Sequence, residues 1–212
     1  MKTSDRKLLK GYYWNHDAIR KDMDKLKTIV NKIDSYSTDD FNKLHNWFIY
    51  HEQCILAHHH GEDGFFFPIM REKQPDFLIK IDAMEHEHIA LDEGLAKLNG
   101  LFKELKSGNK TALDNFISAA KNYIDLVIGH LDKEEIIVNE VISKLPEAEV
   151  LKTELEYRNK IPRSEMALLM PWMVDAMDEK DKKYFFGLAP FFVKWIYNLS
   201  AKPKFEKLTS CI

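Results

Sequence analysis

The sequence predicts an all-α protein: a four-helix up-down bundle with a short helical C-terminal extension. Three observations lead to this prediction. Apolar residues recur at helical spacing in four long segments, turn signals separate these segments, and the chemistry-bearing residues of the first two segments recur in the next two. A chain of 212 residues is long enough to bury a real core. We therefore expect a bundle over residues 1–146 and an extension over residues 147–212 that packs on it.

The first two helices are predicted on either side of a polar break at 35–40. Apolar positions from about Asp5 to Tyr36 follow a helical period. The break reads Ser-Tyr-Ser-Thr-Asp-Asp and can cap the second helix, which we expect to run to about Arg71. Gly61 and Gly64 lie inside this second helix and each costs roughly 1 kcal/mol of helix propensity relative to Ala. Close packing beside a binding site would tolerate or require them.

The third and fourth helices are bounded by proline and glycine. Pro75 fits the first position of a third helix that runs to about Lys106. The Ser-Gly-Asn sequence at 107–109 is a turn signal. The fourth helix is expected from about Thr111 to Leu145, where Pro146 ends it.

The extension differs in composition from the bundle. It is dense in large apolar side chains, and four prolines should cut it into short segments: Pro162, Pro171, Pro190 and Pro203. Aromatic residues at helical spacing usually belong to a core, so we expect short helices that extend the core of the bundle. A lid over a binding pocket, a homodimer surface and a membrane-surface contact are alternatives among which the sequence does not choose.

Composition excludes several classes of protein. The 31 basic and 34 acidic residues give a formal charge of −3, so no electrostatic signature of nucleic-acid binding is present. Cys54 and Cys211 form no Cys-x-x-Cys motif, which fits a reducing cytoplasm. The first residues resemble no signal peptide, and no apolar run approaches the ~20 residues that a membrane span needs.

The most informative pattern is a repeated His-x-x-x-Glu. His58 and Glu62 are four residues apart, as are His130 and Glu134, and this spacing places both side chains of a pair on one helix face. Two such pairs on separate helices are how a bundle builds a two-metal site. A single His precedes each pair and is followed three residues later by Ile. The predicted metal ligands are thus His16, His58, Glu62, His86, His130 and Glu134.

Some alternatives remain open at this stage. The three adjacent histidines at 58–60 allow a second register, in which His59 pairs with Asp63. His45 and His88 are expected at the surface. Asp63 and Glu135, each next to a predicted glutamate ligand, either face away or support the ligands.

Three further side chains lie two helical turns or so before a predicted ligand. They are Tyr50, His51 and Tyr123. We expect them, with Cys54, to form pocket wall or core. The alternative is an extra ligand or a proton or electron relay.

These residues resemble the hemerythrin-like (HHE cation-binding) proteins. The second-helix signature of that family is a His, a Glu four residues later and a Phe-Pro that closes the turn, which His58, Glu62 and 67–68 reproduce. The fourth-helix signature matches residues 130–135, although Glu140 stands where the family has proline. The resemblance covers roughly the first two-thirds of the chain.

The ligand set limits the metal. Imidazole and carboxylate suit iron, manganese or zinc better than magnesium or calcium. The resemblance implies two iron ions with an oxo or hydroxo bridge, whereas the residues alone also allow manganese or a mixed pair.

One departure from the family bears on activity. The oxygen carriers of the family have an additional His on the third helix, four residues from the first; here Ala90 follows His86 by four residues and Asp82 precedes it by four. Six ligands for two ions leave coordination positions open to dioxygen, peroxide or nitric oxide. We therefore favour an oxidoreductase or oxygenase, with a small organic substrate as an option.

Two other functions stay open. The first is non-catalytic carrying or sensing of dioxygen, nitric oxide or iron. The second is iron donation to iron–sulfur centres, but the relatives that do this have a Cys-rich N-terminal domain, which this sequence lacks.

Overall fold

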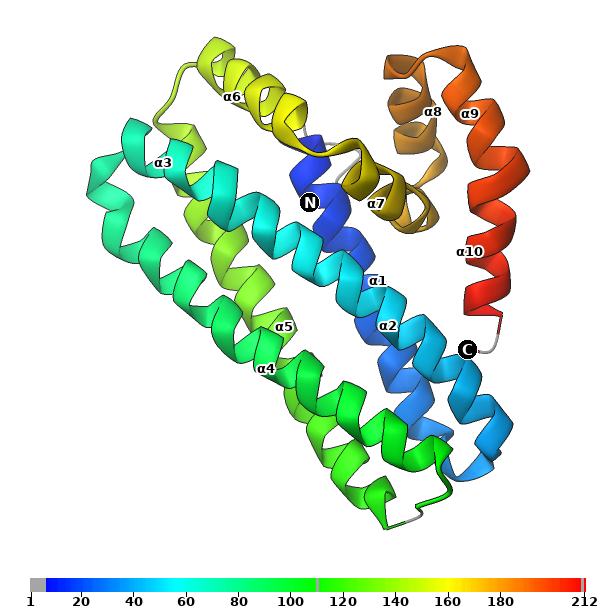
Figure 1. Cartoon of the computed structure of the whole chain (residues 1–212). Helices are drawn as coiled ribbons and strands as arrows, with labels where there is room; N and C mark the ends of the chain where they lie inside the picture. Colours follow the sequence, from blue (N-terminus) through cyan, green and yellow to red (C-terminus); the bar gives the residue numbers. More distant parts are fainter. Residues whose placement is uncertain (1–6, 110, 211) are drawn as a thin grey trace.

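The computed structural model describes residues 7–109, 111–210 and 212, and these residues form helices and short connections without any strand (Figure 1). This confirms the all-α prediction. Helix α1 contacts α2 and α5, and α4 contacts the same two helices, so these four lie side by side around a common core. They are α1 (Lys10–Asn31), α2 (Thr38–Gly61), α4 (Leu78–Lys106) and α5 (Ala112–Ser143).

The start of α2 is fixed by the predicted cap. Ser37 accepts a hydrogen bond from the backbone of Asp40, while the Asp40 carboxylate accepts one from the Ser37 backbone. This reciprocal pair satisfies two amide groups that a helix start leaves without partners. A short 3-10 turn, η2 (Ile33–Ser35), connects it to α1.

The second predicted helix is interrupted. Helix α2 gives way to a π-helical turn, η3 (Glu62–Phe66), and then to α3 (Phe67–Lys73). Pro68 lies in the first turn of α3 and has no N–H to donate to the preceding turn. The wider turn therefore falls where the regular hydrogen-bond ladder is already broken.

Helix α1 is about five residues shorter at each end than the predicted span of Asp5 to Tyr36, of which Asp5 lies outside the described residues. The boundaries of α4 and α5 lie within three residues of the predicted ones. Pro75 opens a 3-10 turn, η4 (Pro75–Phe77), from which α4 continues. Gly108 has a φ of 85°, so the predicted turn at 107–109 uses the one residue type that adopts this conformation freely.

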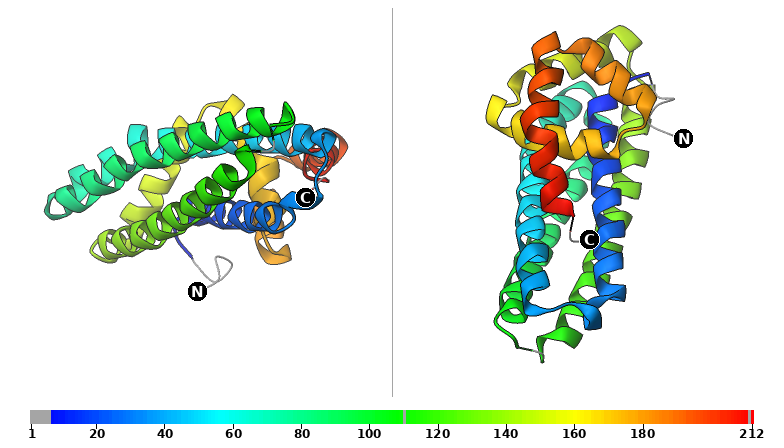
Figure 2. Two further views of the ribbon diagram at one scale, coloured as in Figure 1. Left: turned by 90° about the horizontal axis from the view of Figure 1, so that it is seen from below. Right: turned by 90° about the vertical axis from the view of Figure 1, so that its right-hand side faces the viewer.

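The extension contains a series of shorter helices. Two of its prolines, Pro162 and Pro190, precede helix starts as predicted. Pro171 instead lies inside a helix, and Pro203 lies in the first turn of another that directly continues a π turn, so that, like Pro68, it has no N–H to donate to the preceding turn. The elements are α6 (Glu147–Lys160), α7 (Arg163–Ala176), α8 (Glu179–Leu188), α9 (Phe191–Ile196), the π turn η5 (Tyr197–Ala201) and α10 (Lys202–Thr209). Helix α7 crosses α1 and α2, and α10 contacts α2 and α7 (Figure 2).

The buried apolar residues form two clusters with a polar layer between them. One cluster includes Tyr12 on α1 and Met84 on α4, and the other includes Ile19 and Leu91 on the same helices. On each of the four bundle helices, the stretch between the residues of one cluster and those of the other contains a buried His, a buried Glu or both. The core is thus divided by a layer of side chains with metal-binding chemistry.

None of the helices in the described part of the chain has the length and apolar character that crossing a bilayer requires.

Candidate metal centre

Five of the six predicted ligands meet in the polar layer. His16 comes from α1, His58 and Glu62 from α2 and the π turn that follows it, and His130 and Glu134 from α5. All five side chains are almost fully buried, with exposed fractions of 0–3%. The i,i+4 spacing of each His-Glu pair brings His58 Nε2 within 3.2 Å of Glu62 Oε1 and His130 Nε2 within 3.3 Å of Glu134 Oε2.

The sixth predicted ligand, His86, is not part of this layer. Its side chain is exposed, whereas His88, which we expected at the surface, is 3% exposed and lies in the cluster. The buried face of α4 carries Met84 and Leu91, and His88 is four residues after the first and three before the second. This places His88 on the core face and turns His86 away from it.

His45, also expected at the surface, is buried as well. Its Nε2 atom lies 2.8 Å from Asn99 Oδ1, and its ring stacks on Phe102. The expectation was wrong because a buried His needs only one polar partner to be accommodated in a core.

Two groups of ligand atoms share Glu134, and Glu62, which belongs to the first group, also approaches the second. His16 Nε2 is 3.7 Å from Glu62 Oε1 and 3.6 Å from Glu134 Oε2, and His58 Nε2 approaches the same Oε1 atom. On the other side, His88 Nε2 is 3.7 Å from Glu62 Oε2 and 3.2 Å from His130 Nε2. Each histidine pair thus faces both carboxylates, so an ion held by either pair would have both glutamates within reach.

The unpartnered atoms test whether metal ions fit this layer. Nε2 of His16 and of His58, and both carboxylate oxygens of Glu62 and of Glu134, are buried without a hydrogen-bond partner. One such group costs about 1–3 kcal/mol, so six that converge on one point would be strongly destabilising without a ligand. Borderline nitrogen and oxygen donors are suited to iron, manganese or zinc. The residues therefore fit a pair of transition-metal ions.

Carboxylates orient three of the four histidines. Glu135 Oε1 is 3.1 Å from His16 Nδ1, and Asp63 Oδ1 is 2.9 Å from His88 Nδ1. Glu87 Oε2 is 3.1 Å from His130 Nδ1. A carboxylate that accepts the Nδ1 proton leaves Nε2 free to bind a metal and makes it more basic. For Asp63 and Glu135, support of the ligands is one of the two roles that the sequence left open, whereas Glu87 was missed.

Two of the three supporting carboxylates are themselves held by cations. Arg20 donates to Glu135 at 2.6 Å, and Lys133 donates to Glu87 at 3.0 Å. Burial raises the pKa of Glu135, but hydrogen bonds and charge from His16 and Arg20 outweigh it and lower the pKa to about 2. Glu135 is therefore ionised at neutral pH and stays an acceptor for His16.

The two glutamates of the layer differ in their electrostatic surroundings. Burial, and then the nearby charge of Glu134, raises the pKa of Glu62 well above its usual range. Burial also raises the pKa of Glu134, but His130, His16 and His58 outweigh this effect and lower it. The raised pKa favours the protonated form of Glu62, so metal binding, which needs the carboxylate, would release a proton.

Two tyrosines, one from the bundle and one from the extension, lie close to the layer. The Tyr12 ring lies 4.1 Å from the His16 ring, and its buried hydroxyl has no hydrogen-bond partner. Tyr157 from α6 packs against Gly61, where a Cβ atom would come within 2.6 Å of its hydroxyl. Burial, and then the glutamate charges, raises the pKa of both phenols, which keeps them protonated. Gly61 is thus required by packing, whereas the nearest atom to a Cβ at Gly64 is 3.9 Å away.

The alternative register finds no support in the geometry. His59 Nδ1 lies 2.9 Å from Asp92, not Asp63, and Asp63 faces His88. The His59 ring stacks on that of His88, with centroids 4.0 Å apart. His59 therefore packs beside the layer.

Tyr50, His51 and Tyr123 belong to a different buried network. His51 Nδ1 is 2.9 Å from Asp22 Oδ2, the Tyr123 hydroxyl is 3.5 Å from His51 Nε2, and Tyr50 donates to the Leu168 carbonyl. Trp172 of α7 also donates to Asp22, at 2.7 Å. This network joins the extension to the bundle and supplies no atom to the metal layer.

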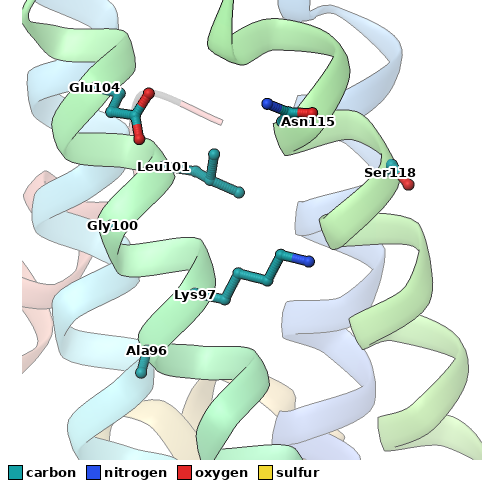
Figure 3. A pocket seen from close by; sticks show the side chains of 7 residues that line it. All are labelled: Ala96, Lys97, Gly100, Leu101, Glu104, Asn115 and Ser118. Atoms are coloured by element: carbon teal, nitrogen blue, oxygen red, sulfur yellow. The ribbon is translucent and has the colours of Figure 1, made fainter.

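A separate surface cavity of about 490 Å³ lies between α4 and α5 (Figure 3). Its lining includes Lys97, Glu104, Asn115 and Ser118 but no residue of the polar layer. It is therefore not an entrance to the metal layer.

The comparison with protein families agrees with this geometry. Residues 14–142 match the hemerythrin HHE cation-binding domain. The chain belongs to this family, and the matched range contains every residue of the polar layer. Comparisons with curated proteins and with solved structures gave no match.

Proposed function

We propose that the polar layer binds two iron ions and that the protein uses them in redox chemistry with dioxygen or peroxide. The observation that carries the proposal is the pair of ligand groups that share Glu134, with Glu62 in the first group and its Oε2 atom 3.7 Å from His88 Nε2 of the second. Six buried donor atoms of this layer have no hydrogen-bond partner. His16 and His58 would hold one ion, and His88 and His130 the other. Manganese is compatible with the same donors.

The protein's own contribution is orientation and exclusion of water. Glu135, Asp63 and Glu87 fix three imidazole rings with Nε2 toward the layer. Two histidines and two shared carboxylates per ion leave coordination positions for a small oxidant, and an iron pair supplies electrons to it when bound. Tyr12 keeps its proton and can donate a hydrogen bond to a molecule that enters beside His16.

The burial of the layer favours small reactants. The four histidines and two glutamates of the layer are each at most 3% exposed, and Tyr157 packs over the turn that carries Glu62. Dioxygen, peroxide and nitric oxide are therefore better substrates or ligands than a bulky organic molecule. The same burial also suits reversible carrying or sensing, which is the alternative function.

Gas exchange separates the two functions. Protein purified from cells grown with iron should contain two ions per chain by elemental analysis. After anaerobic reduction, exposure to air and removal of the gas under argon, a redox protein stays oxidised until a reductant is added, and it consumes peroxide. Repeated return to the ferrous spectrum without reductant would instead establish a carrier.

We also propose that residues 1–146 form the metal-binding unit, that 147–212 cover it, and that the protein acts in the cytoplasm. The first two proposals rest on the contacts of α6 and α7 with the bundle. The third rests on Cys54, which lies in the described part of the chain and is buried as a free thiol.

A further inference from the structure

The outer face of α9 and η5 carries a continuous apolar surface. Five exposed side chains recur at helical spacing over two turns, and we call them the terminal stripe. They are Phe191 (89% exposed), Phe192 (49%), Trp195 (64%), Ile196 (48%) and Leu199 (61%). Isolated exposed apolar residues are normal, but a contiguous patch marks a surface that meets something else.

The segment is already anchored on its opposite face. Tyr197 and Phe205 are buried, the Phe186 ring lies 5.2 Å from that of Tyr197, and Phe205 packs on Tyr50 of α2. The terminal stripe is therefore not a core face that failed to pack. It is a second apolar face on a segment whose first face is in place.

Charge indicates what covers the stripe. Residues 179–209 contain seven lysines and three acidic residues, for a net charge of +4, although the whole chain carries −3. Lys194 lies within the stripe's own helix and Lys202 and Lys204 follow it, all three exposed. A symmetric contact between two copies would place these lysines against each other. An anionic surface would instead attract them.

We propose that the terminal stripe docks on an anionic lipid surface. Trp, Phe and Leu on one face with lysines beside them are the composition of helices that lie in the interface plane of a membrane, with the aromatic rings among the headgroups. Each lysine near such a surface strengthens binding by about five-fold. The rest of the protein, with its negative charge, stays on the water side. The proposal is independent of the metal layer.

Vesicle binding by the full-length protein tests this directly. We expect cosedimentation with vesicles of phosphatidylcholine and phosphatidylglycerol at low salt, with at least about tenfold weaker binding to phosphatidylcholine alone. The double variant F191S/W195S should lose about tenfold or more in binding to the anionic vesicles. Ile79→Ser, at an 85% exposed position on α4, is the matched control and should bind as the native protein does.

A fluorescence measurement locates the contact. Trp195 is exposed, whereas Trp14, Trp47 and Trp172 are at most 5% exposed. Brominated lipids should therefore quench the native protein and leave the Trp195→Phe variant unquenched. Equal vesicle binding by F191S/W195S and native protein would overturn the proposal. So would a doubling of mass in light scattering that the same variant abolishes, because the occupant would then be a second copy.

Discussion

At the scale of single residues, the two histidines of α4 lie on different faces of the helix, and this decides which of them can bind a metal. His88 Nε2 points to His130 and Glu62, while the His86 side chain is exposed. We expect His88→Ala to retain about one ion per chain and His86→Ala to retain two, measured by elemental analysis after desalting. Loss of an ion from the His86 variant alone would contradict the assignment.

Most of the site could be predicted from spacing, because a His and a Glu four residues apart on a helix face the same way whatever surrounds them. This holds for His58 with Glu62 and for His130 with Glu134. His88 has no such partner on its own helix, so its role depends on the face it shares with Met84 and Leu91. That apolar spacing was visible in the sequence and is a better guide than the Ile that follows each upstream His.

Glu87, Asp92 and Tyr157 could not be assigned in this way. Each contacts a residue of another helix. Glu87 and Asp92 are 33 residues or more away in sequence from the histidines that they contact. Only the packing angle between helices brings such residues together.

At the scale of elements, the close contact between α6 and the end of α2 makes a specific demand on Gly61. A Cβ there would meet the Tyr157 hydroxyl at 2.6 Å. We expect Gly61→Ala to lower the free energy of unfolding by about 1 kcal/mol or more, because a closely packed ring must shift. Urea denaturation at neutral pH would measure it.

Two controls accompany this prediction. Gly64→Ala, where the nearest atom is 3.9 Å from the added Cβ, should be neutral or stabilising by up to about 1 kcal/mol. In a Tyr157→Phe background, which lacks the hydroxyl, the cost of Gly61→Ala should largely vanish. An equal cost in both backgrounds would show that the strain lies elsewhere.

Asp22 connects α7 to the bundle and makes stability depend on pH. Burial raises its pKa, but His51 and Lys25 outweigh this effect and lower it. Since the folded pKa lies below the unfolded value of about 3.9, the contribution of Asp22 is fully present above that pH and is lost as the pH falls through the folded pKa.

We therefore expect Asp22→Asn to cost about 3–5 kcal/mol at pH 6, because it leaves a buried imidazole without its carboxylate. The difference from the native protein should shrink as the pH is lowered toward 3 in a urea series. Asp24→Asn, two residues later and exposed, should cost less than about 1 kcal/mol at every pH. A difference that grows on acidification would contradict this sign.

The helices themselves were largely predictable, and the exceptions have local causes. Ser37 and Asp40 mark a helix start because their side chains bond to nearby backbone. The π turn at Glu62–Phe66 could not be predicted, because a wider turn uses the same residues and the same apolar spacing as a regular helix. Such turns occur often at functional sites, and this one contains Glu62, one of the two glutamates of the polar layer.

At the scale of the whole molecule, metal binding should contribute directly to stability. Without bound ions, six polar atoms of the layer would be buried without partners between the two apolar clusters. An ion at 1,000 times its Kd stabilises the folded state by about 4 kcal/mol. For a chain of this size, that corresponds to a Tm difference of about 10 °C.

Differential scanning calorimetry of the native protein before and after chelation should show this decrease, and added iron or manganese should restore the Tm. Glu62→Ala is the informative comparison, because it removes one shared ligand and should reduce the response to metal. An unchanged Tm on chelation would show that the layer binds no ion.

The supporting carboxylates are distributed unevenly between the two proposed ion positions, and this should affect the order in which the two ions bind and are released. Both His88 and His130 have an acidic partner on Nδ1, but of His16 and His58 only His16 has one among the described residues. Basic imidazoles hold a metal more tightly, and such a partner is worth about 10–100-fold in affinity. Filling and emptying should therefore be sequential: a slow titration with chelator should pass through a species with a single ion between α4 and α5. A cell short of metal would then contain a half-filled form of the protein, structurally distinct from both the full and the empty one.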